Sequence, residues 1–167
     1  NHMAGSLEAA SAKQAEALAA QAAEMSGVTN AIGQSQMVIE FKLDGTVLTA
    51  NENFLTTLGY RLDEIIGRHH RMFCDPAFTA TGDYVAFWQK LNRGEFDSGV
   101  HRWLGQGGKE LWLQASFTPI LDAHGKIAKI MTFATDVTAR RQYNAEYEGK
   151  IAAIMKLQAV IEFNLDG

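Results

Sequence analysis

Residues 110–137 read ELWLQASFTPILDAHGKIAKIMTFATDV, and they carry the clearest strand pattern in the chain. Apolar side chains occupy every second position from Leu111 to Phe117, which is the period of a half-buried strand. The glycine-containing AHGK at residues 123–126 is typical of a turn, and IAKIMTFATDV after it reads as a second strand. The pattern predicts a long antiparallel pair as the framework of the domain.

Three more strand segments are predicted upstream of this pair. MVIEFKL (residues 37–43) and TVLTA (residues 46–50) flank Asp44-Gly45, a favoured hairpin turn in which both central residues need positive φ. DSGVHRWLG (residues 97–105) then leads through the Gly-rich QGGK into the long pair. The strands therefore come as two, followed by three.

Short helices are predicted between the second and the third strand. Asn51 is placed to cap the segment NENFLTTLGY, and RLDEIIG reads as another helical turn that ends at Gly67. Residues 82–93 form a clearer helix, because their apolar side chains share one face. That face carries Tyr84, Phe87, Trp88 and Leu91. The sequence thus predicts an α+β fold: a five-stranded antiparallel sheet with short helices on one face.

Amphipathic helices are predicted to flank this domain at both ends. Residues 7–35 are rich in alanine and lack proline, so their helix propensity is high. Mostly small side chains recur there at steps of three and four among a few larger apolar ones, which gives a weak heptad seam. Because an isolated alanine helix gains little stability in water, we expect this helix to pack against a partner. The seam consists of Ser11, Ala15, Leu18, Ala22, Met25, Thr29 and Ile32, and it returns at Tyr147, Ile151 and Ile154.

An internal repeat predicts a tandem arrangement of domains. VIEFKLDG at residues 38–45 returns as VIEFNLDG at residues 160–167. Repetition at a fixed spacing is the signature of a duplicated unit. The predicted organisation is a tag remnant (1–6), an N-terminal linker helix (7–35), a sensor domain (36–136), a C-terminal linker helix (137–159) and the start of a second copy (160–167).

Composition excludes several classes of protein. The net charge is −4 and no run of Lys or Arg occurs, so nucleic acid is not an expected partner. No apolar run approaches the roughly 20 residues of a membrane span. The single cysteine, Cys74, cannot form an intramolecular disulfide and indicates a reducing, cytoplasmic compartment.

Several landmarks of the chain resemble those of PAS domains. They are NENFLTTLGYRLDEIIGR, FWQKLNRGEF, GGKELWLQASFTPILDAHGKI and ATDVTARR, which together span about residues 36–141. The segment GRHHRMFCDPAF is similar to the PAS domains of soluble bacterial methyl-accepting chemotaxis receptors with tandem PAS copies. The resemblance implies a non-enzymatic sensory module in the bacterial cytoplasm. It also implies a homodimer formed through the flanking helices and a downstream signalling domain in the parent chain.

The resemblance assigns a signal junction to Asp136 and Thr138. These residues match the Asp-x-Thr motif at which the last PAS strand passes into the exit helix. Either side chain can cap that helix, so a movement of the sheet would alter the first helical turn. An ordinary helix cap without a switching role is the alternative.

His69, His70, Cys74 and Asp75 form a cluster of potential metal ligands. Adjacent histidines seldom converge on one ion, and no second pair lies nearby in the sequence, so a zinc site is not predicted. A Cys74 nucleophile is not predicted either, because no orienting group or oxyanion site can be named for it.

A cofactor pocket is the sharper hypothesis for this cluster. Some PAS aerotaxis receptors similar to this one take a haem ligand from the turn that holds His69 and His70. They also carry a tryptophan on the last strand, which is absent here. Flavin is the second candidate, and for it the chain has Cys74-Asp75-Pro76 where the flavin-binding relatives have Arg-His-Pro. The predicted pocket residues are His70, His69, Met72, Phe73, Trp88, Phe54, Leu58, Met131 and Phe133, with His70 favoured as the iron ligand. A ligand-free dimerisation and relay module remains the alternative.

Overall fold

The computed structural model describes the backbone of residues 2–165 and the side chains of residues 3–28 and 30–158. The chain divides into two units, residues 1–36 and residues 37–167. The first unit is a single helix, α1 (His2–Ser35). Asn1, which belongs to the predicted tag remnant, lies outside the described residues. So do Asp166 and Gly167, the last two positions of the predicted second copy.

The second unit is built on a five-stranded antiparallel sheet, as predicted. The strands are ordered β2-β1-β5-β4-β3, so β2 and β3 are the edge strands. The two long strands of residues 110–137 lie inside the sheet, where β5 pairs with both β1 and β4. The bounds are β1 (Met37–Phe41), β2 (Val47–Ala50), β3 (Asp97–Leu104), β4 (Glu110–Leu121) and β5 (Ile127–Asp136).

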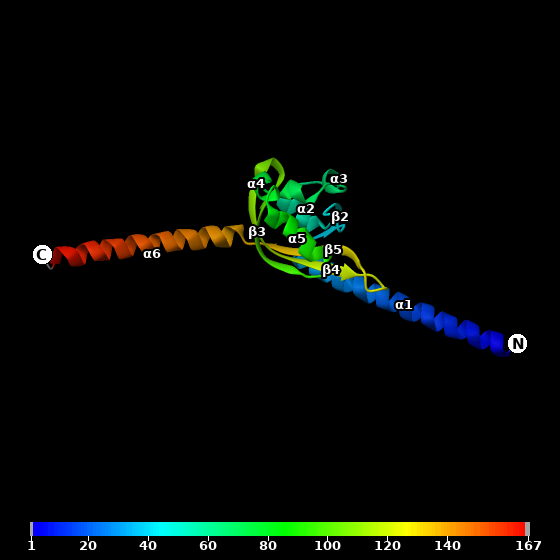
Figure 1. The fold of residues 1–167 in the computed structure, drawn as a ribbon. Helices are drawn as coiled ribbons and strands as arrows, with labels where there is room; N and C mark the ends of the chain where they lie inside the picture. Colours follow the sequence, from blue (N-terminus) through cyan, green and yellow to red (C-terminus); the bar gives the residue numbers. More distant parts are fainter. Residues whose placement is uncertain (1, 166–167) are drawn as a thin grey trace. The chain divides into compact units, whose positions relative to one another are not determined.

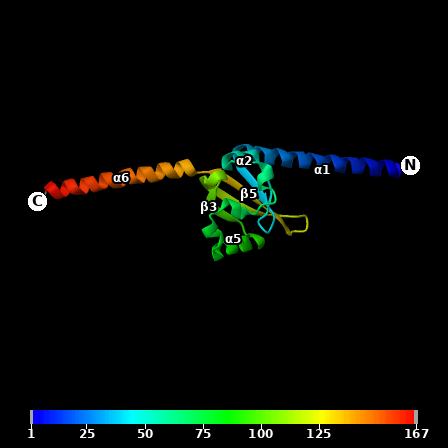
Figure 2. The same ribbon diagram turned by 90° about the horizontal axis from the view of Figure 1, so that it is seen from above.

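Short helices lie on one side of this sheet (Figure 1). Two of them begin where the sequence supplies a cap: the Asn51 side chain accepts a hydrogen bond from the Phe54 N–H, and the Thr81 side chain accepts one from the Tyr84 N–H. The longest of these short helices, α5, lies beside β3 (Figure 2). The helices are α2 (Glu52–Leu58), α3 (Leu62–Ile65), the 3₁₀ turn η1 (His70–Phe73), α4 (Pro76–Thr79) and α5 (Gly82–Asn92).

The core lies between these helices and the inner face of the sheet. Strand alternation places one set of side chains on this face, and helices α2 and α5 cover it. Aromatic residues dominate the contact, because large rings bury the most apolar surface. The largest fully buried side chains include Trp103, Phe41, Phe54, Phe73, Phe117, Ile39, Leu113 and Ile130.

The turn between β1 and β2 differs from the predicted two-residue hairpin. The Gly45 N–H bonds to the Lys42 carbonyl and the Lys42 N–H bonds to the Thr46 carbonyl, which makes a longer loop. Gly45 has a φ of 90°, and no residue other than glycine has positive φ among the described residues. The prediction that both Asp44 and Gly45 have positive φ is therefore wrong. Asp44 instead accepts a hydrogen bond from the Thr46 N–H with its side chain, 2.9 Å away.

Gly45→Ala is expected to destabilise the domain by roughly 2 kcal/mol. Alanine is strained at a left-handed φ, and its methyl group would disrupt the hydrogen bond between His69 Nε2 and the Asp44 carbonyl oxygen. A methyl group at Gly45 would lie 2.6 Å from Nε2 of His69. Gly125→Ala is the matched control, because Gly125 has a φ of 77° and open space around it. Urea denaturation measures both variants. Equal losses in the two would contradict the contact with His69.

A long exit helix, α6 (Thr138–Leu165), follows β5. It extends past the predicted end of the linker at residue 159, so residues 160–165 are helical here although they repeat the sequence of β1. Among the described residues, no helix combines the length and the apolar content that crossing a membrane requires.

Candidate functional site

A pocket of about 450 Å³ opens beside the edge strand β3. One wall comes from η1 and α4, the second from α5, and the third from β3. Its lining is mostly apolar and aromatic, which is typical of small-molecule sites. The lining includes His70, Cys74, Phe87, Val100, Arg102 and Trp103.

His70 forms the inner end of this pocket and is 3% exposed. Its ring packs edge-on against the rings of Phe41, Trp88 and Trp103, with centroids 5.1–5.4 Å away. Burial away from water lowers the pKa of His70 to about 3. The imidazole is therefore uncharged at neutral pH.

One ring nitrogen of His70 is held by its neighbours. Nδ1 lies 3.0 Å from the Tyr84 hydroxyl and 3.6 Å from the Cys74 sulfur. Burial raises the pKa of both the Cys74 thiol and the Tyr84 hydroxyl to about 12, so neither group ionises at neutral pH. The thiol is consequently a poor nucleophile, since the thiolate is the reactive form.

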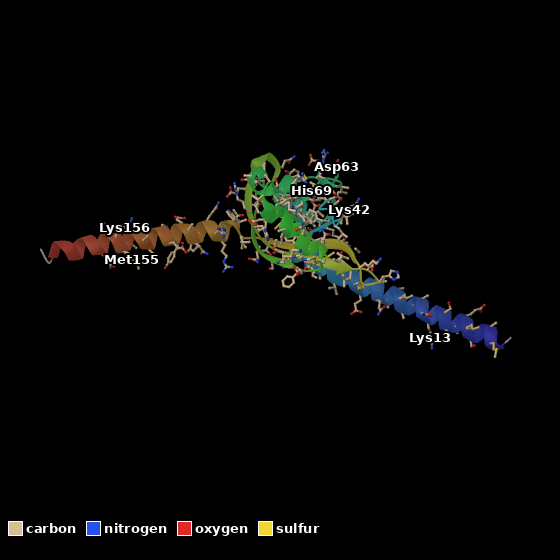
Figure 3. The ribbon with its side chains drawn as sticks, in the orientation of Figure 1. Lys13, Lys42, Asp63, His69, Met155 and Lys156 are labelled. Atoms are coloured by element: carbon tan, nitrogen blue, oxygen red, sulfur yellow. The ribbon has the colours of Figure 1, made fainter. Side chains whose placement is uncertain are left out.

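His69 has a different environment from its neighbour. Its Nε2 lies 2.6 Å from the Asp44 carbonyl oxygen, and its Nδ1 accepts a hydrogen bond from the Arg71 N–H at 3.1 Å. Figure 3 shows His69 on the side of the domain that carries Lys42. Because both ring nitrogens of His69 are engaged in local contacts, this residue fastens η1 to the β1–β2 turn.

The other predicted pocket residues from the helical layer lie in the core around His70. Phe73 stacks on Trp103 with a centroid distance of 5.3 Å, and Phe54 meets both rings edge-on. Leu58 is fully buried and Met72 packs against the same core. These residues support the wall of the pocket from behind.

Met131 and Phe133 are not brought together with His70. The buried positions of β5 are Ile130, Thr132 and Ala134, so the alternation of the strand places Met131 and Phe133 on the opposite face. Both belong to the pocket predicted from the sequence. The register of β5 assigns them to the outer face instead.

Four ring-bearing residues of the pocket were missing from the predicted set, and one of them is Phe78 on α4. Phe87 lies on α5, while His101 and Trp103 alternate with outward residues along β3. Burial is the main cause that lowers the pKa of His101, although Asp97, 3.4 Å away, opposes it. The period of two in DSGVHRWLG was the available signal, because it places His101 and Trp103 on one face.

An ion-pair cluster forms the rim of the pocket. Arg102 lies on β3 and also lines the pocket. Its Nη1 lies 3.1 Å from the carboxylate of Asp75, which is the N-cap of α4. Its Nη2 lies 2.8 Å from the carboxylate of Glu110 at the start of β4. All three side chains are partly exposed, so these pairs contribute little to stability.

The predicted junction joins α6 to the sheet through several contacts. The Asp136 side chain accepts hydrogen bonds from the N–H and the hydroxyl of Thr138. The Trp112 N–H on β4 donates to the Thr138 hydroxyl at 2.9 Å, and its carbonyl accepts from the Val137 N–H at 2.8 Å. The Arg141 guanidinium lies 4.0 Å from the centre of the Trp112 ring. The first turn of α6 is thus attached to β4 as well as to β5.

The site meets one requirement for haem, an imidazole that could bind iron, but not the other, which is space for the macrocycle. His70 offers a neutral imidazole whose Nδ1 is held by Tyr84, which would leave Nε2 for iron. Seven aromatic rings lie within 6.5 Å of the His70 ring, however, and leave little room beside it for a macrocycle. The residues therefore do not fit haem in this arrangement. The described residues also contain no cluster of three or more His, Cys, Asp or Glu side chains that could hold a metal ion.

A five-stranded antiparallel sheet, a helical layer on one face and an attached exit helix define an α+β domain. Residues 33–142 match the family described as the PAS fold, and the chain belongs to this family. The resemblance read from the sequence is thereby confirmed.

Two named bacterial proteins are similar in sequence. Biofilm dispersion protein BdlA of Pseudomonas aeruginosa is 42% identical over 137 residues, 82% of this chain and 33% of BdlA. The aerotaxis receptor of Escherichia coli is 29% identical over 96 residues, 58% of this chain and 19% of the receptor. The chain thus spans a third or less of the length of these relatives.

Solved structures show the same fold. An RNA-binding light-oxygen-voltage receptor aligns with a TM-score of 0.64 at 20% identity, over 81% of this chain and 38% of the receptor. A PAS domain from Colwellia psychrerythraea aligns with a TM-score of 0.59 at 19% identity, over 69% of this chain and 98% of that domain.

Proposed function

We propose that this chain is the sensory part of a bacterial chemotaxis-type receptor. It binds a small molecule in the pocket beside β3 and passes the signal to α6. The observation that carries the proposal is the pocket of about 450 Å³ lined by His70, Phe87 and Trp103, in a domain related to BdlA and to the aerotaxis receptor.

The strands provide a physical connection between the pocket and α6. Arg102 at the pocket rim is the cross-strand partner of Trp112, and Trp103 is the partner of Leu111. Trp112 in turn holds Thr138 and Arg141 of α6. A shift of β3 against β4 therefore reaches the first turn of the exit helix through one strand.

Filling the pocket by mutation tests this connection without a ligand. Val100 is 44% exposed and lines the pocket, so Val100→Trp adds a ring there without removing a core residue. We expect hydrogen exchange at the Val137 and Arg141 amides to change by about threefold or more, because these amides report opening of the first turn.

Ser98→Trp is the matched control for this experiment. Ser98 lies on the same face of β3 as Val100, two residues away, but does not line the pocket. The proposal predicts no change at α6 in this variant. Unchanged exchange in both variants would instead support the ligand-free relay module.

We also infer that the flanking helices pair with a second copy of the chain. Leu18 on α1 is 61% exposed, and Ile154 and Leu157 on α6 are exposed as well. Apolar side chains at heptad positions gain stability when a partner helix covers them. The repeat at residues 160–167 supports a further inference, that a second sensor domain follows in the parent protein.

Leu18→Glu is expected to weaken self-association, because it places a charge in the seam. Ala20→Glu introduces the same charge two residues away, outside the seam, and should leave association unchanged. Sedimentation equilibrium of the wild type and both variants checks this, and we expect at least a tenfold weaker dimer for Leu18→Glu alone. A wild type that stays monomeric at high concentration would contradict the pairing.

A further inference from the structure

The charges around the pocket differ from those of a site for an anionic cofactor. We propose that the pocket beside β3 takes an uncharged, flat and mostly apolar molecule, and that its rim disfavours anions. This inference rests on the proposed function, since it assigns a chemical class to the ligand of the same pocket.

The inner wall of the pocket carries polar groups but no charge. His70, Cys74 and His101 line it, and all three are neutral at pH 7 because burial disfavours their ionised forms. A charged group of a ligand would lose its water here without finding a counter-ion, which is unfavourable. The part of a ligand that reaches His70 is therefore uncharged.

The rim carries more negative charge than positive charge. Of the pocket's lining residues, only Asp75 and Arg102 carry a formal charge, and Glu110 adds a second carboxylate. The guanidinium of Arg102 already bonds to both acids, at 3.1 Å and 2.8 Å. An incoming phosphate or carboxylate would have to displace a carboxylate from Arg102 and would still meet the other one. Flavin phosphates and porphyrin carboxylates are disfavoured for this reason.

The walls favour a flat ring system. Phe87 on α5 and Trp103 on β3 line the pocket together with Phe78 on α4. Aromatic side chains pack best against other rings, either stacked or edge-on, and they contribute most of their binding energy through apolar contact. A planar uncharged molecule meets these walls without leaving a buried charge unpaired.

Two fluorescent probes with the same ring system separate the alternatives. N-phenylnaphthylamine is neutral, whereas anilinonaphthalenesulfonate carries one sulfonate. Titrated into the folded protein, the neutral probe should bind about tenfold more tightly, or better. Val100→Trp should abolish this binding, and Ser98→Trp should leave it unchanged.

Glu110→Gln tests the charge argument directly. Glu110 is half exposed and lies outside the core, so this variant should fold. It frees one side of Arg102, and we expect it to strengthen binding of the sulfonate probe about fivefold while the neutral probe binds as before. Tighter binding of the sulfonate probe than of the neutral one in the wild type would overturn the assignment.

Two further outcomes distinguish a wrong ligand class from a wrong proposed function. Absence of binding by either probe to the folded wild type would overturn both the ligand class and the proposed function. A Soret shift on addition of haemin that His70→Ala removes and His69→Ala retains would overturn the ligand class alone. Such a result would make His70 an iron ligand and leave the sensory function in place.

Discussion

Trp103→Ala is expected to lower the free energy of unfolding of the sensor domain by about 3–5 kcal/mol, the usual cost of removing a large buried ring. Trp103 is 1% exposed and contacts the rings of Phe54, Phe73 and His70. The substitution removes the part of the wall that joins the pocket to α2 and η1. Urea denaturation followed by circular dichroism gives the value.

Trp112→Ala is the control for this prediction. Trp112 lies on the neighbouring strand and faces outward, where its ring is only partly buried and contacts Arg141. We expect this variant to lose less than half as much stability. Similar losses for both tryptophans would mean that the aromatic cluster around His70 does not hold the core together.

Acidification is expected to destabilise the domain through His70, by about 2 kcal/mol between pH 7 and pH 5. The pKa of His70 is lowered from 6.5 to about 3 in the folded chain because the ring is buried. The unfolded state therefore binds the proton more readily than the folded state. This stabilisation is fully present above pH 6.5 and is lost progressively as the pH falls towards 3.

His70→Phe should remove most of this pH dependence, since phenylalanine keeps a ring in the site but binds no proton. Burial also lowers the pKa of His101, so a smaller slope of the same sign should remain in the variant. His124→Gln, in the exposed turn between β4 and β5, is the control and should retain the full slope. Urea denaturation at several pH values tests the prediction. A wild-type stability that is flat from pH 7 to pH 5 would contradict a buried neutral His70.

The sheet and most helices could be predicted because local patterns determine them. The period of two in β4, the cap at Asn51 and the single apolar face of α5 all agree with the structure. The β1–β2 turn was predicted incorrectly in detail, since contacts of Gly45 and Asp44 with η1, far along the chain, help to set its shape.

The pocket was harder to predict than the fold. Sequence reasoning found the turn that holds His70 and favoured His70 as the iron ligand. It nevertheless placed His69 in the pocket as well, because which of the two faces inward depends on the backbone of η1. It placed Met131 and Phe133 in the pocket, whereas strand register assigns them to the outer face. Phe87, His101 and Trp103 meet His70 only through the packing of α5 and β3 against η1.

According to the proposed function, binding of a small molecule in the pocket changes the first turn of α6. The most direct test is hydrogen exchange at the Val137 and Arg141 amides with and without saturating N-phenylnaphthylamine. We expect exchange at both amides to change by about threefold or more in the wild type and to stay constant in Val100→Trp, in which the pocket is filled. A probe that protects the amides of η1 and β3 but leaves α6 unchanged would contradict the claim.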